Sequence, residues 1–205
     1  MVIHVVPMSL HIPAGLAGHE PIDVDVRAFL IEHPDGITLI DTGVAAEPAT
    51  IADRLAELGA SWSDVSDVLL THNHPDHTGG LARIRNLAPA ATVWASPLDH
   101  HVGTLSPLVE GTTVRGLEVL PLPGHTPGHV GFIHAIDGVV FAGDIVGVSD
   151  GRLVPAPERF TADPVQAALS MHSLADTTSC RVLFSHGPEI DNPVSALRDL
   201  LNRST

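Results

Sequence analysis

The segment Thr71-His72-Asn73-His74-Pro75-Asp76-His77 limits what this chain can fold into more than any other feature. It gathers three imidazoles and one carboxylate directly after an apolar strand predicted over residues 65–71. His72 and His74 alternate, so an extended backbone places both rings on one side, whereas Asp76 and His77 turn into a helix and point elsewhere. Two directions of ligation favour two adjacent metal ions. Imidazole nitrogen with carboxylate oxygen suits zinc, iron or manganese.

Four further motifs have a similar form, with polar residues and glycine at the end of a predicted strand. They are Leu39-Ile40-Asp41-Thr42-Gly43, Pro123-Gly124-His125-Thr126-Pro127-Gly128-His129, Phe141-Ala142-Gly143-Asp144 and Leu183-Phe184-Ser185-His186-Gly187. Each motif alone is weak, and a histidine cluster on a surface is the alternative for the first segment. Five such motifs in one short chain favour a metal site over packing.

In this order, the motifs resemble those of the metallo-β-lactamase superfamily of dinuclear metallohydrolases. The resemblance runs from Asp41 through His186 and is nearest to the short, single-domain members of the glyoxalase II type. It implies an α/β (α+β) fold, the αββα sandwich, in which two mixed sheets pack face to face with helices outside. A length of 205 residues agrees with a single domain over 1–205, since a domain typically has about 100–200 residues.

The resemblance also implies the metal ligands, which are five histidines and two aspartates: His72, His74, Asp76, His77, His125, Asp144 and His186. The first ion would be held by His125 with the two leading histidines of the first motif. The second would be held by Asp76, His77 and His186, and Asp144 would bridge both ions. The other histidines, among them His129, are expected to be surface or packing residues.

The implied chemistry is hydrolysis. A hydroxide bridging two divalent ions would attack the carbonyl of a small ester-like or thioester substrate. Asp76 would orient this nucleophile or carry its proton to the leaving group, and Asp41 would accept a hydrogen bond that orients a ligand histidine. We expect Zn²⁺, with iron or manganese as the alternatives.

Other functions stay open at this point. A lactonase of the same fold is one, although the chain has no tyrosine to assist the carbonyl oxygen as in some lactone-hydrolysing relatives. A persulfide dioxygenase is another, in which a single iron would be bound by His72, His125 and Asp144. The third is a metal-stabilised binding module without catalysis.

Composition restricts the kinds of molecule that the chain can bind. The net charge of −14 disfavours binding to nucleic acid. All ten basic residues are arginine, which excludes catalysis by a lysine side chain. No apolar run reaches the length of a membrane span, and the first residues lack the positive region of a signal peptide, so we expect a cytoplasmic protein. The expected partner is a small-molecule substrate, held by loops over 8–23, 101–114 and 145–160. The oligomeric state is open, with a homodimer as one option.

Hydrophobic periodicity predicts the remaining elements. The predicted strands cover residues 24–32, 36–41, 65–71, 92–95, 117–120, 130–134, 138–142 and 181–184. The predicted helices cover residues 47–58, 81–87, 163–174 and 193–202. Weak periodicity over residues 7–20, 101–114 and 145–160 predicts loops.

Overall fold

The structure is a computed structural model that describes residues 1–16, 18–44 and 48–203. The chain forms two compact units, the first made of Met1–Leu69 with His74–Val93, the second of Leu70–Asn73 with the chain from Trp94 onward. The single domain expected from the length stays a prediction. No helix among the described residues combines the length and the apolar character needed to cross a membrane.

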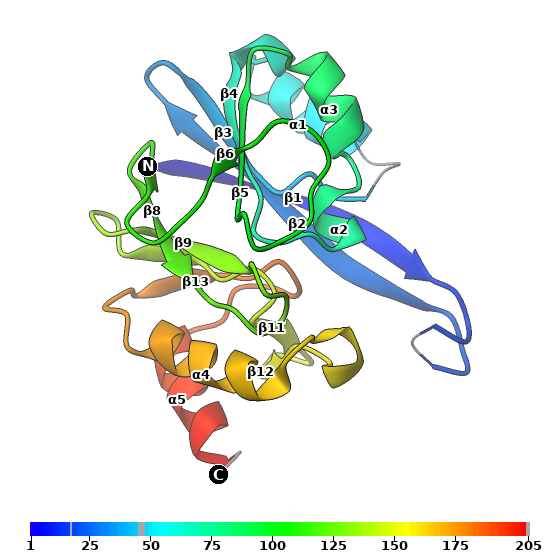
Figure 1. The fold of residues 1–205 in the computed structure, drawn as a ribbon, viewed down its shortest axis with the longest axis vertical. Helices are drawn as coiled ribbons and strands as arrows, with labels where there is room; N and C mark the ends of the chain where they lie inside the picture. Colours follow the sequence, from blue (N-terminus) through cyan, green and yellow to red (C-terminus); the bar gives the residue numbers. More distant parts are fainter. Residues whose placement is uncertain (17, 45–47, 204–205) are drawn as a thin grey trace. The chain divides into compact units, whose positions relative to one another are not determined.

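The first unit is built on a long antiparallel hairpin (Figure 1). Strand β1 (Val2–Ile12) pairs with β2 (Ile22–His33) along its whole length. A tight turn leads to β3 (Gly36–Ile40), which pairs with β2 in antiparallel and with β4 (Val65–Leu69) in parallel orientation. The carboxyl ends of β3 and β4 therefore lie at the same edge of the sheet, where Asp41 donates its N–H to Leu69 O at 2.9 Å.

Helices complete this unit. In α1 (Pro48–Glu57), Ile51 and Leu55 are one turn apart and buried, and the helix contacts β1. Shorter helices follow: η1 (Trp62–Asp64), α2 (Pro75–Thr78) and α3 (Leu81–Leu87). The strands of this unit have the order β1-β2-β3-β4, and the second unit begins within β5 (Thr92–Ala95), which pairs in parallel with β6 (Ser106–Pro107).

The second unit contains a sheet of order β13-β10-β9-β8-β7. Its strands are β7 (Thr113–Val114), β8 (Leu117–Pro121), β9 (Val130–His134), β10 (Val139–Phe141) and β13 (Arg181–Leu183). The pairing is antiparallel except for β10 with β13, which is parallel. The carboxyl ends of β8, β10 and β13 consequently lie at one edge of the sheet.

Two helices cover the core of the second unit. Helix α4 (Pro164–Ala175) has Asp163 as its N-cap, and the Asp163 side chain accepts a hydrogen bond from Gln166 N–H at 2.9 Å. It packs against α5 (Pro193–Arg203), which also contacts β13 (Figure 1). Both helices bury apolar side chains in the same cluster as the sheet, including Leu174 and Leu197.

Two predicted loops are wrong in part. The first part of the loop expected over 7–20 belongs to β1, because pairing with β2 holds residues 7–12 extended even though polar residues interrupt the apolar pattern. Much of 145–160 is a hairpin of β11 (Val146–Ser149) and β12 (Arg152–Pro155), followed by η2 (Glu158–Phe160). Its turn, Asp150-Gly151, has φ angles of 50° and 72°, as a two-residue hairpin turn requires.

The other boundaries differ from the expectations by a few residues, and the segment 101–114 contains only the short strands β6 and β7. The helices predicted over 81–87, 163–174 and 193–202 and the strands over 92–95 and 130–134 are confirmed. The first residue of the helix predicted over 47–58 lies outside the described residues.

Candidate metal centre

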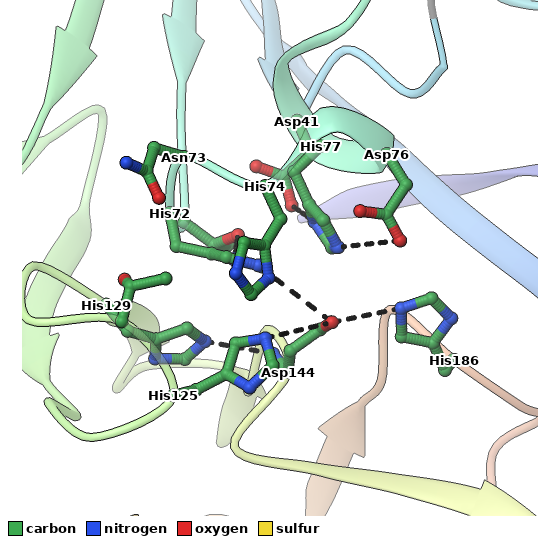
Figure 2. A network of polar contacts seen from close by, with 12 residues as sticks. Asp41, His72, Asn73, His74, Asp76, His77, His125, His129, Asp144 and His186 are labelled. Atoms are coloured by element: carbon green, nitrogen blue, oxygen red, sulfur yellow. Dashed lines mark hydrogen bonds and ion pairs between the residues drawn. The ribbon is translucent and has the colours of Figure 1, made fainter. Parts of the chain in front are cut away.

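Four of the predicted ligands meet within the second unit. The Oδ2 atom of Asp144 lies 3.0 Å from His186 Nε2, 3.5 Å from His125 Nε2 and 3.9 Å from His72 Nε2. Figure 2 shows these contacts as dashed lines that converge on the carboxylate. The ring nitrogens that His72 and His125 could offer to a metal ion lie within 4.8 Å of each other. Residues separated by more than a hundred positions in the sequence thus share one small volume.

The sheet explains this convergence. His125 follows β8, Asp144 follows β10 and His186 follows β13, so all three emerge from the edge where these strands end. Gly143, with φ of 57°, makes the turn before Asp144, and a Cβ atom here would lie 2.5 Å from His129 Nε2. Glycine is therefore needed for both the backbone conformation and the close packing.

Hydroxyl groups orient two of these histidines. His72 Nδ1 lies 3.0 Å from Thr71 Oγ1, and His125 Nδ1 lies 3.3 Å from Thr161 Oγ1. The Thr161 hydroxyl donates to Pro157 O at 3.1 Å, so it accepts from His125 Nδ1–H. With Nδ1 engaged, the Nε2 atom of each ring is the one directed toward Asp144. Such an arrangement fixes the tautomer and the direction of a ligand histidine.

A second group lies in the first unit. His77 is fully buried and donates from Nδ1 to Asp41 Oδ2 at 2.8 Å, so Asp41 fixes the orientation of this ring. Its Nε2 atom lies 3.7 Å from Asp76 Oδ2 (Figure 2). The carbonyl of His77 accepts hydrogen bonds from the N–H and the hydroxyl of Thr42, at 2.7 and 2.8 Å. The ring and backbone of His77 are thus both fixed by the segment after β3.

His74 is the N-cap residue of α2 and precedes Pro75 at the first helical position. Its carbonyl accepts hydrogen bonds from His77 N–H and from the N–H and hydroxyl of Thr78, each at 3.0 Å. These bonds fix the backbone of the first motif between its extended and helical parts, as the sequence predicts. The assignment of the seven predicted residues as ligands stays a prediction.

His129 has a definite role that sequence reasoning did not give it. Its ring is buried, donates from Nδ1 to Leu122 O at 3.1 Å and accepts the N–H of Asp144 at Nε2, at 2.9 Å. Both ring nitrogens therefore bond to backbone groups, and His129 holds the backbone of Asp144. Its place inside the third motif was the only sign of this role in the sequence. Sequence reasoning also missed Asp99, which no motif contains.

The donor set fits a divalent cation. It consists of imidazole nitrogens and carboxylate oxygens, and the single cysteine of the chain, Cys180, lies outside every motif. Donors of these types bind zinc, iron and manganese.

The second unit also has a cavity of about 160 Å³ with mainly apolar lining. Leu108, Val109 and Glu110 contribute to this lining. They belong to the segment 101–114, one of the loops that we expect to contact substrate.

Comparison with known sequences gives a consistent family. A model of the metallo-β-lactamase superfamily matches residues 22–186. The uncharacterised protein YobT of Bacillus subtilis is 26% identical over 87% of this chain and 90% of its own length. Two hydroxyacylglutathione hydrolases, from Cereibacter sphaeroides and a Synechococcus strain, are 33% and 34% identical over 85% and 84% of this chain. The chain covers 71% and 68% of their respective lengths.

Solved structures agree with the sequence comparison. TTHA1623 in a di-iron-bound form has a TM-score of 0.72 and 28% identity, covering 93% of this chain and 96% of that chain. The metallo-β-lactamase family protein TTHA1429 from Thermus thermophilus has a TM-score of 0.75 and 23% identity, covering 98% of this chain and 79% of that chain. These similarities confirm the predicted fold class, the αββα sandwich.

Proposed function

Because the chain belongs to the metallo-β-lactamase superfamily, we propose that it is a dinuclear metal-dependent hydrolase of a small thioester or ester-like substrate. The observation that carries the proposal is the convergence of His72, His125 and His186 on the Asp144 carboxylate. Three imidazole Nε2 atoms directed at one carboxylate are the donor types of a cation site.

The proposed ligands are those implied by the sequence. His72, His74 and His125 would hold one ion, Asp76, His77 and His186 would hold the other, and Asp144 would contribute to both. When bound, the ions would lower the pKa of a coordinated water and polarise the substrate carbonyl. Zinc is the proposed metal. Iron is the first alternative, because TTHA1623 is described in a di-iron-bound form.

Asp76 is the proposed proton carrier. Its side chain is only 15% exposed and lies 3.7 Å from the ring of His77, which Asp41 holds from the opposite side. A carboxylate fixed in this way can orient a nucleophile and receive its proton, then deliver the proton to the leaving group. Asp41 is the proposed positioning residue for His77.

A thioester is favoured over a lactone. The hydroxyacylglutathione hydrolases from Cereibacter sphaeroides and the Synechococcus strain are 33% and 34% identical to this chain. A thiolate is a good leaving group and needs little assistance, and this chain has no tyrosine to assist a carbonyl oxygen. A net charge of −14 also favours a small molecule over nucleic acid, whose phosphates it repels.

Metal analysis combined with a substrate panel tests the proposal. We expect close to two zinc ions per chain and hydrolysis of acyl thioesters in preference to lactones and β-lactams. In Asp76→Ala the rate should fall by about 10²–10⁴-fold, the usual contribution of a positioned acid or base. The matched control, Asp53→Ala, changes an exposed aspartate of α1 and should leave the rate unchanged.

Two outcomes would overturn the proposal. A single iron per chain with oxygen uptake on a persulfide substrate would establish the dioxygenase alternative instead. A folded wild-type protein that binds no metal when zinc, iron and manganese are supplied in turn would exclude both enzymes.

A further inference from the structure

Asp99 is a buried carboxylate that takes no part in the proposed ligand set. It follows β5 in the second unit, and only 6% of its surface is exposed. Three donors surround it: Oδ2 accepts from Asn73 N–H at 3.0 Å and from the Thr126 hydroxyl at 2.8 Å, and Oδ1 accepts from Gly128 N–H at 2.7 Å. A buried carboxylate with three short hydrogen bonds is a strong anchor, since bonds to charged groups exceed those between neutral groups.

The donors belong to the two loops that carry proposed ligands. Asn73 directly follows His72, and Thr126 directly follows His125. Gly128 directly precedes His129, whose ring holds the backbone N–H of Asp144. One carboxylate thus links segments that are more than fifty residues apart in the sequence. Each segment carries a histidine that contacts Asp144: His72 and His125 near its carboxylate, and His129 at its backbone N–H.

We propose that Asp99 is a positioning residue for metal binding, which holds His72 and His125 at the separation that a shared ion requires. This inference rests on the proposed function. The two rings meet edge to face with centroids 4.8 Å apart, and they come from separate loops. A metal site tolerates errors of only about 0.5 Å in its ligands, so a link between the loops has a direct effect on affinity.

The surroundings of Asp99 require a carboxylate. All three of these partners are donors. An asparagine at position 99 would therefore direct its side-chain NH₂ group, itself a donor, at one or more of them. The fit is also tight, because a Cβ atom on Gly128 would lie 2.7 Å from Asp99 Cγ and from Asp99 N. Glycine at position 128 therefore allows the loop to approach Asp99 closely enough for its N–H to reach Oδ1.

The test compares Asp99→Asn with Asp64→Asn. Asp64 is a matched control, because its carboxylate also accepts from a backbone N–H and a hydroxyl, those of Ser61 at 2.8 and 2.9 Å, but it lies in η1 and is exposed. A third variant, Thr126→Val, removes one donor while keeping the shape of the side chain, and serves if Asp99→Asn folds poorly.

Two measurements are made on each protein. Zinc dissociation constants are obtained by competition with a chromophoric chelator. Amide hydrogen exchange at residues 73 and 128 is followed by NMR in the metal-free protein. We expect Asp99→Asn to weaken zinc binding by about 10–100-fold, as loss of a group that orients ligands does, with faster exchange at the amide that faces the new NH₂ group. Thr126→Val should weaken zinc binding by about 3-fold, because one hydrogen bond to Asp99 is lost. Asp64→Asn should change neither quantity.

The outcomes separate this inference from the proposed function. Faster exchange in Asp99→Asn with a wild-type zinc dissociation constant would show a purely structural role and overturn the inference alone. Unchanged exchange at both amides would show that the hydrogen bonds do not matter, and would also overturn it. A wild-type protein that binds no zinc, iron or manganese would overturn the proposed function, and with it a role for Asp99 in metal binding.

Discussion

Replacing His129 by leucine tests whether this ring holds the metal site together. The ring is buried and makes two hydrogen bonds to backbone groups, donating to Leu122 O at 3.1 Å and accepting from Asp144 N–H at 2.9 Å. Leucine can form neither. Each buried group that loses its partner costs about 1–3 kcal/mol, so the loss of two partners should lower the free energy of unfolding by about 2–6 kcal/mol. In His129→Gln, one bond can be kept and about half of this loss is expected.

Urea denaturation of metal-free protein measures this change, because bound metal would add its own stabilisation. His172→Gln is the control: His172 is exposed on α4, and a surface change of this kind should alter the free energy of unfolding by less than about 0.5 kcal/mol. If His129→Leu were as stable as this control, the two hydrogen bonds would contribute nothing net, and the role assigned to His129 would be wrong. Zinc affinity should fall in parallel, because Asp144 would lose the bond that fixes its backbone.

Three further changes give independent tests. Asp41→Asn should lower zinc affinity by about 10–100-fold without changing the fold, since His77 loses the carboxylate that orients it; competition with a chelator measures this. Gly143→Ala should lower the free energy of unfolding by about 2 kcal/mol more than Gly151→Ala, because both have positive φ but only the former brings a Cβ to 2.5 Å from the His129 ring. Equal losses would show that backbone strain, not the clash, is decisive. Removal of metal with a chelator should lower the melting temperature, with recovery that depends on the concentration of added zinc; an unchanged melting temperature would contradict a bound ion.

Much of the fold was predictable because local patterns agreed with the tertiary structure. The helix Leu81–Leu87 and the strand Thr92–Ala95 were predicted with the observed bounds. The long strand β1 was missed because its order depends on pairing with β2, including exposed cross-strand contacts such as His11 with Asp23 at 2.9 Å. The hairpin of β11 and β12 was missed although Asp150-Gly151 is a typical turn pair, because its strands are short.

The candidate site residues could be identified from the sequence where they belong to short motifs. His77 and Asp41 are 36 residues apart and hydrogen-bonded, and each stands in a recognisable pattern; the sequence predicts that Asp41 orients a ligand histidine but does not indicate which one. Asp99 has no such pattern: its role comes from three donors on distant loops, and nothing next to it in the sequence indicates that they meet there. Residues that position ligands through the backbone are therefore the part of the site that sequence reasoning misses.

The candidate ligands of this sheet follow the carboxyl ends of β8, β10 and β13. Among the described residues, the opposite edge of the sheet carries no candidate ligand. There, the turn between β9 and β10 carries Ile136, which is 92% exposed. This turn is therefore a suitable attachment point for a fluorophore or a surface tether. A label there would be separated from the Asp144 cluster by the length of the strands, so ion binding could be followed on immobilised protein without altering the residues under test.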